Sequence, residues 1–70
     1  MHLSDVCRII KERRSLLGIT QQDLSDISGV GLRTIKKVET NKANPSVKTL
    51  MKIVDVLGME LDLKIKSLVE

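Results

Sequence analysis

The chain contains no phenylalanine, tyrosine or tryptophan, and it has only one cysteine and one histidine. Without aromatic rings it cannot bind nucleic acid by stacking bases on aromatic side chains, and its core must be built from Leu, Ile, Val and Met. A single cysteine cannot form a disulfide within the chain, and one His with one Cys cannot complete a structural zinc site. We therefore expect neither a disulfide framework nor a metal centre.

Long apolar runs are also absent, since no more than two apolar residues follow one another. This pattern excludes a membrane-spanning segment and the core of a secretion signal, so we expect a cytoplasmic chain with no membrane partner. Apolar residues make up 41% and charged residues 30% of the 70 residues, which is typical of one folded domain, here residues 1–70. Because the core of so short a chain is small, we expect a second subunit to contribute stability.

Positive charge is concentrated in the middle of the chain. Residues 31–52 contain six Lys or Arg and one acidic residue, whereas residues 1–30 are balanced and residues 53–70 are net negative. A cationic cluster attracts polyanions, and nucleic acid is the commonest of these in a cytoplasm. The alternative is a solvated helix face without a partner, and charge alone does not decide between the two.

The spacing of apolar residues predicts four helices, over residues 4–17, 21–29, 32–39 and 47–57. Residues that favour helix ends flank them: Ser4, Gly18, Thr20 with Asp23, Gly29, Ser46 and Gly58. The side chains expected to face inward are Val6, Ile10, Leu17, Leu24, Ile27, Ile35, Val38, Val47, Leu50, Ile53, Val54 and Leu57. Cys7 is expected to fill the core as a small apolar residue, and Lys48 and Lys52 to be solvated charges.

Residues 60–66 follow a different period, because apolar and charged side chains alternate strictly. Alternation favours a β-strand with one buried face over the alternative, a last helical turn. A strand with no partner in its own chain must pair elsewhere, and we expect antiparallel pairing with the same strand of a second copy. Leu61, Leu63 and Ile65, in a dimerisation tail of residues 59–70, would make the dimer contacts.

A long ordered set of residues resembles the helix-turn-helix DNA-binding domain of the phage-repressor and Cro (XRE) family, over residues 4–58. It comprises Gly18-Ile19-Thr20-Gln21, Leu24-Ser25, Ser28-Gly29-Val30, Thr34-Ile35, Val38-Glu39, Asn44-Pro45-Ser46, Leu50, Ile53 and Leu57-Gly58. The resemblance implies a compact all-α, lambda-repressor-like bundle of four to five helices, with the recognition helix at about 31–39. Two positions depart from the family: Gly31 replaces the usual capping Ser or Thr, and Thr40-Asn41 replaces the commoner Asn-Gly turn.

The resemblance also implies roles for individual residues. The base-reading residues would be Gly31, Leu32, Arg33, Lys36 and Lys37. Arg33 is the best candidate for a bidentate contact to guanine, while Leu32 either touches a thymine methyl group or covers the start of the helix. DNA phosphates would be contacted by Gln21, Thr34, Asn41, Lys42 and Asn44, and Gln21 could equally cap its helix. Arg14 and Glu39 would form an ion pair that joins the first helix to the end of the third.

Together these features predict a sequence-specific regulator that binds double-stranded DNA at a palindromic operator as a homodimer, associated with the nucleoid. No cofactor, small-molecule ligand or enzymatic activity is expected, since no P-loop or nucleophile motif is present. Residues 57–64 are also similar to the C-terminal strand of HipB-like antitoxins, which implies an alternative role as an autoregulating partner of a HipA-type toxin kinase. A third interpretation, from another class, is a protein-interaction module that keeps the helical bundle without binding DNA.

Overall fold

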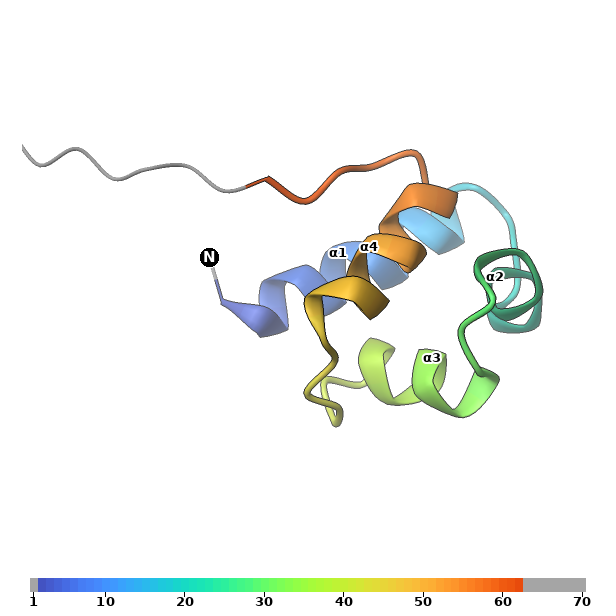
Figure 1. Cartoon of the computed structure of the whole chain (residues 1–70). Helices are drawn as coiled ribbons and strands as arrows, with labels where there is room; N and C mark the ends of the chain where they lie inside the picture. Colours follow the sequence, from blue (N-terminus) through green and yellow to red (C-terminus); the bar gives the residue numbers. More distant parts are fainter. Residues whose placement is uncertain (1, 63–70) are drawn as a thin grey trace, which may run out of the picture.

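The computed structural model describes residues 2–62 and folds them into four helices (Figure 1). The helices are α1 (Leu3–Leu16), α2 (Gln21–Ser28), α3 (Leu32–Glu39) and α4 (Val47–Val56). Helix α2 packs against both α3 and α4, and α1 packs against α3. The prediction of a compact all-helical bundle is confirmed. No helix within the described part of the chain is both long enough and apolar enough to span a bilayer.

One hydrophobic core joins the four helices. Its buried side chains are Cys7, Ile10, Leu24, Val30, Ile35, Val38, Leu50, Ile53, Val54 and Leu57. Cys7 fills space there as predicted, and its burial raises the pKa of the thiol. The sequence prediction was wrong for three residues, because Leu17, Ile27 and Val47 are exposed by 45%, 65% and 66%. Leu17 follows the last residue of α1, and Val47 is the first residue of α4.

The helix starts agree with the sequence prediction at two of three caps. The Thr20 hydroxyl accepts a hydrogen bond from the Asp23 N–H (2.9 Å), and the Asp23 carboxylate accepts one from the Thr20 N–H (2.9 Å), which completes the expected capping box. This backbone hydrogen bond lowers the pKa of Asp23. Ser46 also caps α4 as predicted. Ser4, however, lies inside α1, whose N-cap is His2.

Replacing Ser46 with Ala is expected to lower the free energy of unfolding by about 1 kcal/mol. The Ser46 hydroxyl accepts a hydrogen bond from the Thr49 N–H at 3.1 Å. In the variant, this N–H loses its side-chain acceptor. The matched control is Ser4→Ala inside α1, for which we expect a change of at most about 0.5 kcal/mol. Urea denaturation of the two variants measures the difference, and equal losses would contradict the assigned caps.

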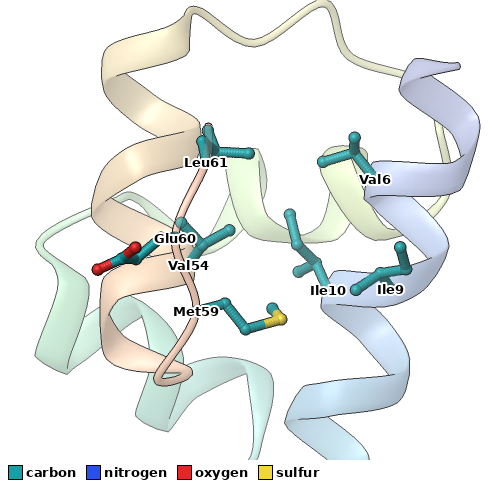
Figure 2. Close-up of a pocket in the computed structure, with 7 residues that line it drawn as sticks. All are labelled: Val6, Ile9, Ile10, Val54, Met59, Glu60 and Leu61. Carbon is teal, nitrogen blue, oxygen red and sulfur yellow. The ribbon is translucent and has the colours of Figure 1, made fainter. Parts of the chain in front are cut away.

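The predicted C-terminal strand is not supported. Residues 60–62 form no strand, and Leu63 and Ile65 lie outside the described residues. The Met59 N–H donates to the Val54 carbonyl at 2.9 Å, so the chain turns back at the end of α4. The apolar side chains of Met59 and Leu61 then lie against α1 and α4 instead of forming one face of a sheet (Figure 2).

Candidate nucleic-acid interface

Helix α3 carries a cationic face and lies along one edge of the bundle (Figure 1). Arg33, Lys36 and Lys37 are exposed, whereas Ile35 and Val38 are buried on the opposite side of the helix. Residues three and four apart are neighbours on a helix surface, so both lysines flank Arg33. The three cations therefore form one continuous patch, which we call the α3 face.

The turn that leads into α3 is fixed by two serines of α2. The Ser25 hydroxyl donates to the Val30 carbonyl (2.6 Å), and the Ser28 hydroxyl accepts from the Val30 N–H (3.1 Å). Gly29 ends α2 with φ +77°, a left-handed conformation that glycine adopts without a Cβ clash. Val30 is buried, so this turn is anchored in the core and sets the direction in which α3 starts.

A buried ion pair holds the other end of α3. The Arg14 Nε and Nη2 atoms donate to the two Glu39 carboxylate oxygens at 2.6 and 2.9 Å, and Arg14 Nη1 donates to the Ile19 carbonyl at 2.8 Å. The Glu39 side chain is only 1% exposed and that of Arg14 is 14% exposed. The bidentate geometry fixes both position and orientation. The pair that the resemblance implied is thus present, and it joins α1 to the end of α3.

Gln21 adds a third helix to this contact. Its amide Nε2 donates to Glu39 Oε1 at 3.0 Å, so a single carboxylate accepts hydrogen bonds from α1 and from the first residue of α2. A glutamine amide has two N–H donors, and one remains after this bond. Glu39 therefore fixes α3 relative to the start of α2, the end of a helix where free N–H groups favour anions.

The Glu39 carboxylate is charged at neutral pH despite its burial. Burial alone would raise the pKa of Glu39, but hydrogen bonds from Arg14 and Gln21, together with the charges of Arg14 and Lys11, outweigh it and lower the pKa. The hydrogen bond to Glu39 in turn raises the pKa of Arg14. Both side chains are therefore charged at neutral pH, and the ion pair holds α1 and the end of α3 together there.

A Schellman-type turn ends α3. Asn41 has φ +57°, its N–H donates to the Val38 carbonyl (3.1 Å), and the Lys42 N–H donates to the Lys37 carbonyl (2.8 Å). Asparagine tolerates this left-handed conformation better than other non-glycine residues, which explains how Thr40-Asn41 replaces the commoner Asn-Gly. The backbone of Asn41 thus has a structural role.

The remaining candidates for DNA contact surround the α3 face. Gly31 is exposed at the start of α3, and Leu32 and Thr34 are half-buried. Asn41, Lys42 and Asn44 are exposed in the loop after α3, and Gln21 is half-buried at the start of α2. Lys48 and Lys52 are exposed on α4, which is a separate helix. The structure thus places the predicted base-reading and phosphate-binding residues on and around one helix.

Two contacts that position these elements were missed from the sequence. One is the Gln21–Glu39 hydrogen bond, and the other is the Arg13 Nε donor to the Leu57 carbonyl (2.9 Å) at the end of α4. Neither contact had a local signal in the sequence, because each joins residues that only the packing of the helices brings together. Among residues 2–62, no three His, Cys, Asp or Glu side chains are grouped so that they could hold a metal ion.

A family model described as Helix-turn-helix matches residues 10–64. The chain is 39% identical over 54 residues to a Methanocaldococcus jannaschii protein named among the HTH-type transcriptional regulatory proteins, covering 77% of this chain and 17% of that protein. It is 35% identical over 58 residues to the SPbeta prophage-derived uncharacterized HTH-type transcriptional regulator YonR of Bacillus subtilis, covering 83% and 54%. An uncharacterized HTH-type transcriptional regulator of Haemophilus influenzae is 38% identical over 58 residues, with 79% and 59% covered.

The chain therefore spans less than two thirds of each of these relatives. No solved structure matches it. The family match covers most of the chain and includes the turn between α2 and α3, the α3 face and Glu39. The chain belongs to the XRE-type helix-turn-helix family, the family of phage repressors and Cro.

Proposed function

We propose that the chain is a sequence-specific DNA-binding transcription regulator that places α3 in the major groove. The observation that carries this proposal is the α3 face. Arg33, Lys36 and Lys37 are exposed on a helix whose opposite side is buried and whose end is held by Glu39. An α-helix fits the major groove, where base edges present a distinct pattern of donors and acceptors. The names of the relatives, as transcriptional regulators, support the same function.

Within this proposal, the side chains of α3 read the bases, and the backbone at the start of α3 comes close to the DNA. Arg33 lies in the first turn of α3, where recognition helices of this type contact base edges, and its guanidinium can bind guanine O6 and N7 together. Lys36 and Lys37 read guanine or hold a phosphate, and Leu32 covers a thymine methyl group. Gly31 has open space where a Cβ would be, so the helix start can come close to the duplex.

Phosphate contacts on both sides of α3 complete the proposed interface. On one side, Gln21 and the N–H groups at the start of α2 form an anion site whose position relative to α3 is set by Glu39. On the other side, Lys42, Asn41 and Asn44 follow the end of α3, and Thr34 lies on α3 itself. Contacts of this kind fix the register of the protein on DNA without reading sequence.

The proposal includes a homodimer on a palindromic operator. Two copies related by a two-fold axis would present two α3 helices to half-sites about 34 Å apart. A narrower form, in which the dimer also binds a toxin kinase, rests on the similarity of residues 57–64 to HipB-like antitoxins. Co-purification of a kinase with the tagged chain tests that narrower form.

Selection of binding sites from random duplexes, followed by affinity measurements on the selected site, tests the DNA-binding function. Arg33→Ala is expected to weaken binding by about 1–3 kcal/mol and to relax preference at one base pair of each half-site. The control is Arg8→Ala, since Arg8 is an exposed arginine of α1 that pairs with Glu12 at 3.1 Å. We expect the control to bind as the wild type does.

Two other outcomes of the same experiment are informative. An equal loss on every sequence would assign Arg33 to a phosphate instead of a base. Recovery of no preferred site, with no binding to any duplex at 50 mM salt, would contradict the proposal and favour the protein-interaction module.

A further inference from the structure

A strip of apolar side chains crosses the surface formed by α1, α4 and residues 59–62. It consists of Leu3, Val6, Val47, Met51 and Leu61, and we call it the apolar strip. Val47 and Met51 are 66% and 54% exposed. All five side chains line one cavity of about 410 Å³. Isolated apolar residues are common on protein surfaces, but a continuous group of this kind marks an interaction site.

The apolar strip continues into a groove between α1 and α4. Val6 and Leu61 also line a neighbouring cavity of about 390 Å³, together with Ile9, Ile10, Val54, Met59 and Glu60. Figure 2 shows the apolar side chains from α1, from α4 and from the segment that follows α4 around a shared gap, whereas the Glu60 carboxylate points away from it. The other large apolar residues exposed in the described part, Leu16, Leu17 and Ile27, line neither cavity.

The two long edges of the apolar strip carry opposite charge. Along α4, Lys48 and Lys52 lie beside Val47 and Met51, with Asp55 near them. A second hollow beside Met51 is lined by Glu60 and Asp62, and Asp55 borders both hollows. A partner of one charge sign would meet a like-charged edge. A second copy related by a two-fold axis that runs parallel to the strip would set each basic edge against an acidic edge. The surface is therefore complementary to itself.

We infer that a second copy of this chain docks on the apolar strip, so that two strips pack together across a two-fold axis. This inference rests on the homodimer of the proposed function and assigns its interface to α1 and α4 instead of paired strands. None of Arg33, Lys36 and Lys37 lines the strip, so the α3 face stays free in the dimer. Residues 40–46 connect the end of α3 to Val47, the first residue of α4.

Sedimentation of the whole chain and of Met51→Lys measures the assigned interface. The wild type is expected to be a dimer, and Met51→Lys is expected to raise the dimer dissociation constant at least tenfold, since it places a charge in the middle of the strip. Leu16→Lys is the matched control, because Leu16 is an exposed apolar residue outside the strip. It should leave the dimer unchanged. Thermal melting of both variants as monitored by circular dichroism establishes that each is folded.

A charge exchange tests whether the charged edges of the two copies face each other in the dimer. Lys48→Glu with Lys52→Glu makes both edges of one chain acidic, and Glu60→Lys with Asp62→Lys makes both edges of another chain basic, apart from Asp55. Each double variant alone should dimerise more weakly than the wild type. Mixed in equal amounts, they should form a heterodimer that is tighter than either homodimer. A mixture that stays as weakly associated as its components would overturn the two-fold arrangement.

DNA binding separates failure of this interface from failure of the proposed function. The Met51→Lys monomer should still bind a single half-site, and Arg33→Ala should still dimerise. A wild-type chain that is monomeric at all concentrations, or a Met51→Lys variant that dimerises like the wild type, would overturn the interface while leaving DNA binding to its own test. Loss of the dimer on deletion of residues 63–70, with Met51→Lys unaffected, would restore strand pairing.

Discussion

Replacing Glu39 with Gln will lower the free energy of unfolding by about 3 kcal/mol at neutral pH. The neutral amide cannot accept from both Arg14 nitrogens, so the Arg14 guanidinium, whose side chain is only 14% exposed, loses its counter-charge. Removing one partner of a buried pair costs far more than losing a surface pair, because the remaining charge stays out of water. The Gln21 amide also loses a charged acceptor.

The matched control for this variant is Glu12→Gln. Glu12 pairs with Arg8 at 3.1 Å, but both side chains are exposed, so we expect a loss of at most about 0.5 kcal/mol. Urea denaturation of the wild type and both variants measures these values. A loss for Glu39→Gln as small as that for Glu12→Gln would contradict the role of the buried pair as a clamp.

The effect of Glu39 should also depend on pH. Because its pKa in the folded chain lies below the ordinary value of 4.5, the stabilisation is fully present above that value and is lost as the pH falls through the lowered pKa. The stability difference between wild type and Glu39→Gln should therefore be constant near neutral pH and narrow below pH 4.5. A difference that is unchanged in acid would show that the carboxylate charge is not responsible.

DNA affinity should fall roughly 10³-fold between 50 and 200 mM salt. If Lys36, Lys37 and Lys42 each neutralise one phosphate, a dimer neutralises about six, and the logarithm of affinity should fall with a slope of about −5 against the logarithm of salt. Each neutralised phosphate releases condensed counterions, and salt opposes that release. Titrations of the selected duplex at several salt concentrations measure the slope.

Lys42→Ala gives this prediction an internal control. It removes one cation from each copy, so the slope should become shallower by about 2 per dimer, while Arg8→Ala on α1 should leave it unchanged. An affinity that does not respond to salt would mean that the cations of the α3 face do not contact phosphates.

The helices could be predicted because their signals are local. The Thr20–Asp23 capping box and the cap at Ser46 lie within four residues of the groups that they satisfy, and both formed as expected. Ser4 failed as a cap because Asp5 accepts from the His2 N–H, so α1 begins two residues earlier than a Ser4 cap would allow. A nearby acidic residue was thus a better indicator of this helix start than the serine.

The direction in which some apolar residues point was not predictable, because it depends on neighbouring helices. Ile27 and Val47 both fit the helical period, yet α2 and α4 bury Leu24 and Leu50 against the core and leave these two exposed. The alternation of apolar and charged residues over 60–66 is present in the sequence, but residues 60–62, which the structure describes, form no strand. Leu61 instead lines the groove between α1 and α4, so its apolar side chain contributes to that surface without a strand.

The part of the candidate interface that lies on α3 could be predicted, because its residues follow the period of a single helix. The period of α3 placed Arg33, Lys36 and Lys37 together, and the resemblance to the family indicated the Arg14–Glu39 pair. The hydrogen bond from Gln21 to Glu39 joins residues eighteen positions apart, and only the packing of α2 on α3 brings them together. No local signal in the sequence encodes that distance.

The central claim is that the α3 face enters the major groove of DNA. Titration of the isotope-labelled chain with its selected duplex, followed by amide chemical shifts in solution, tests this claim most directly. We expect the largest shifts on residues 31–37, with smaller ones at the start of α2 and in the loop 40–44. Shifts centred on α1 and α4, with residues 31–37 unaffected at saturating DNA, would contradict it.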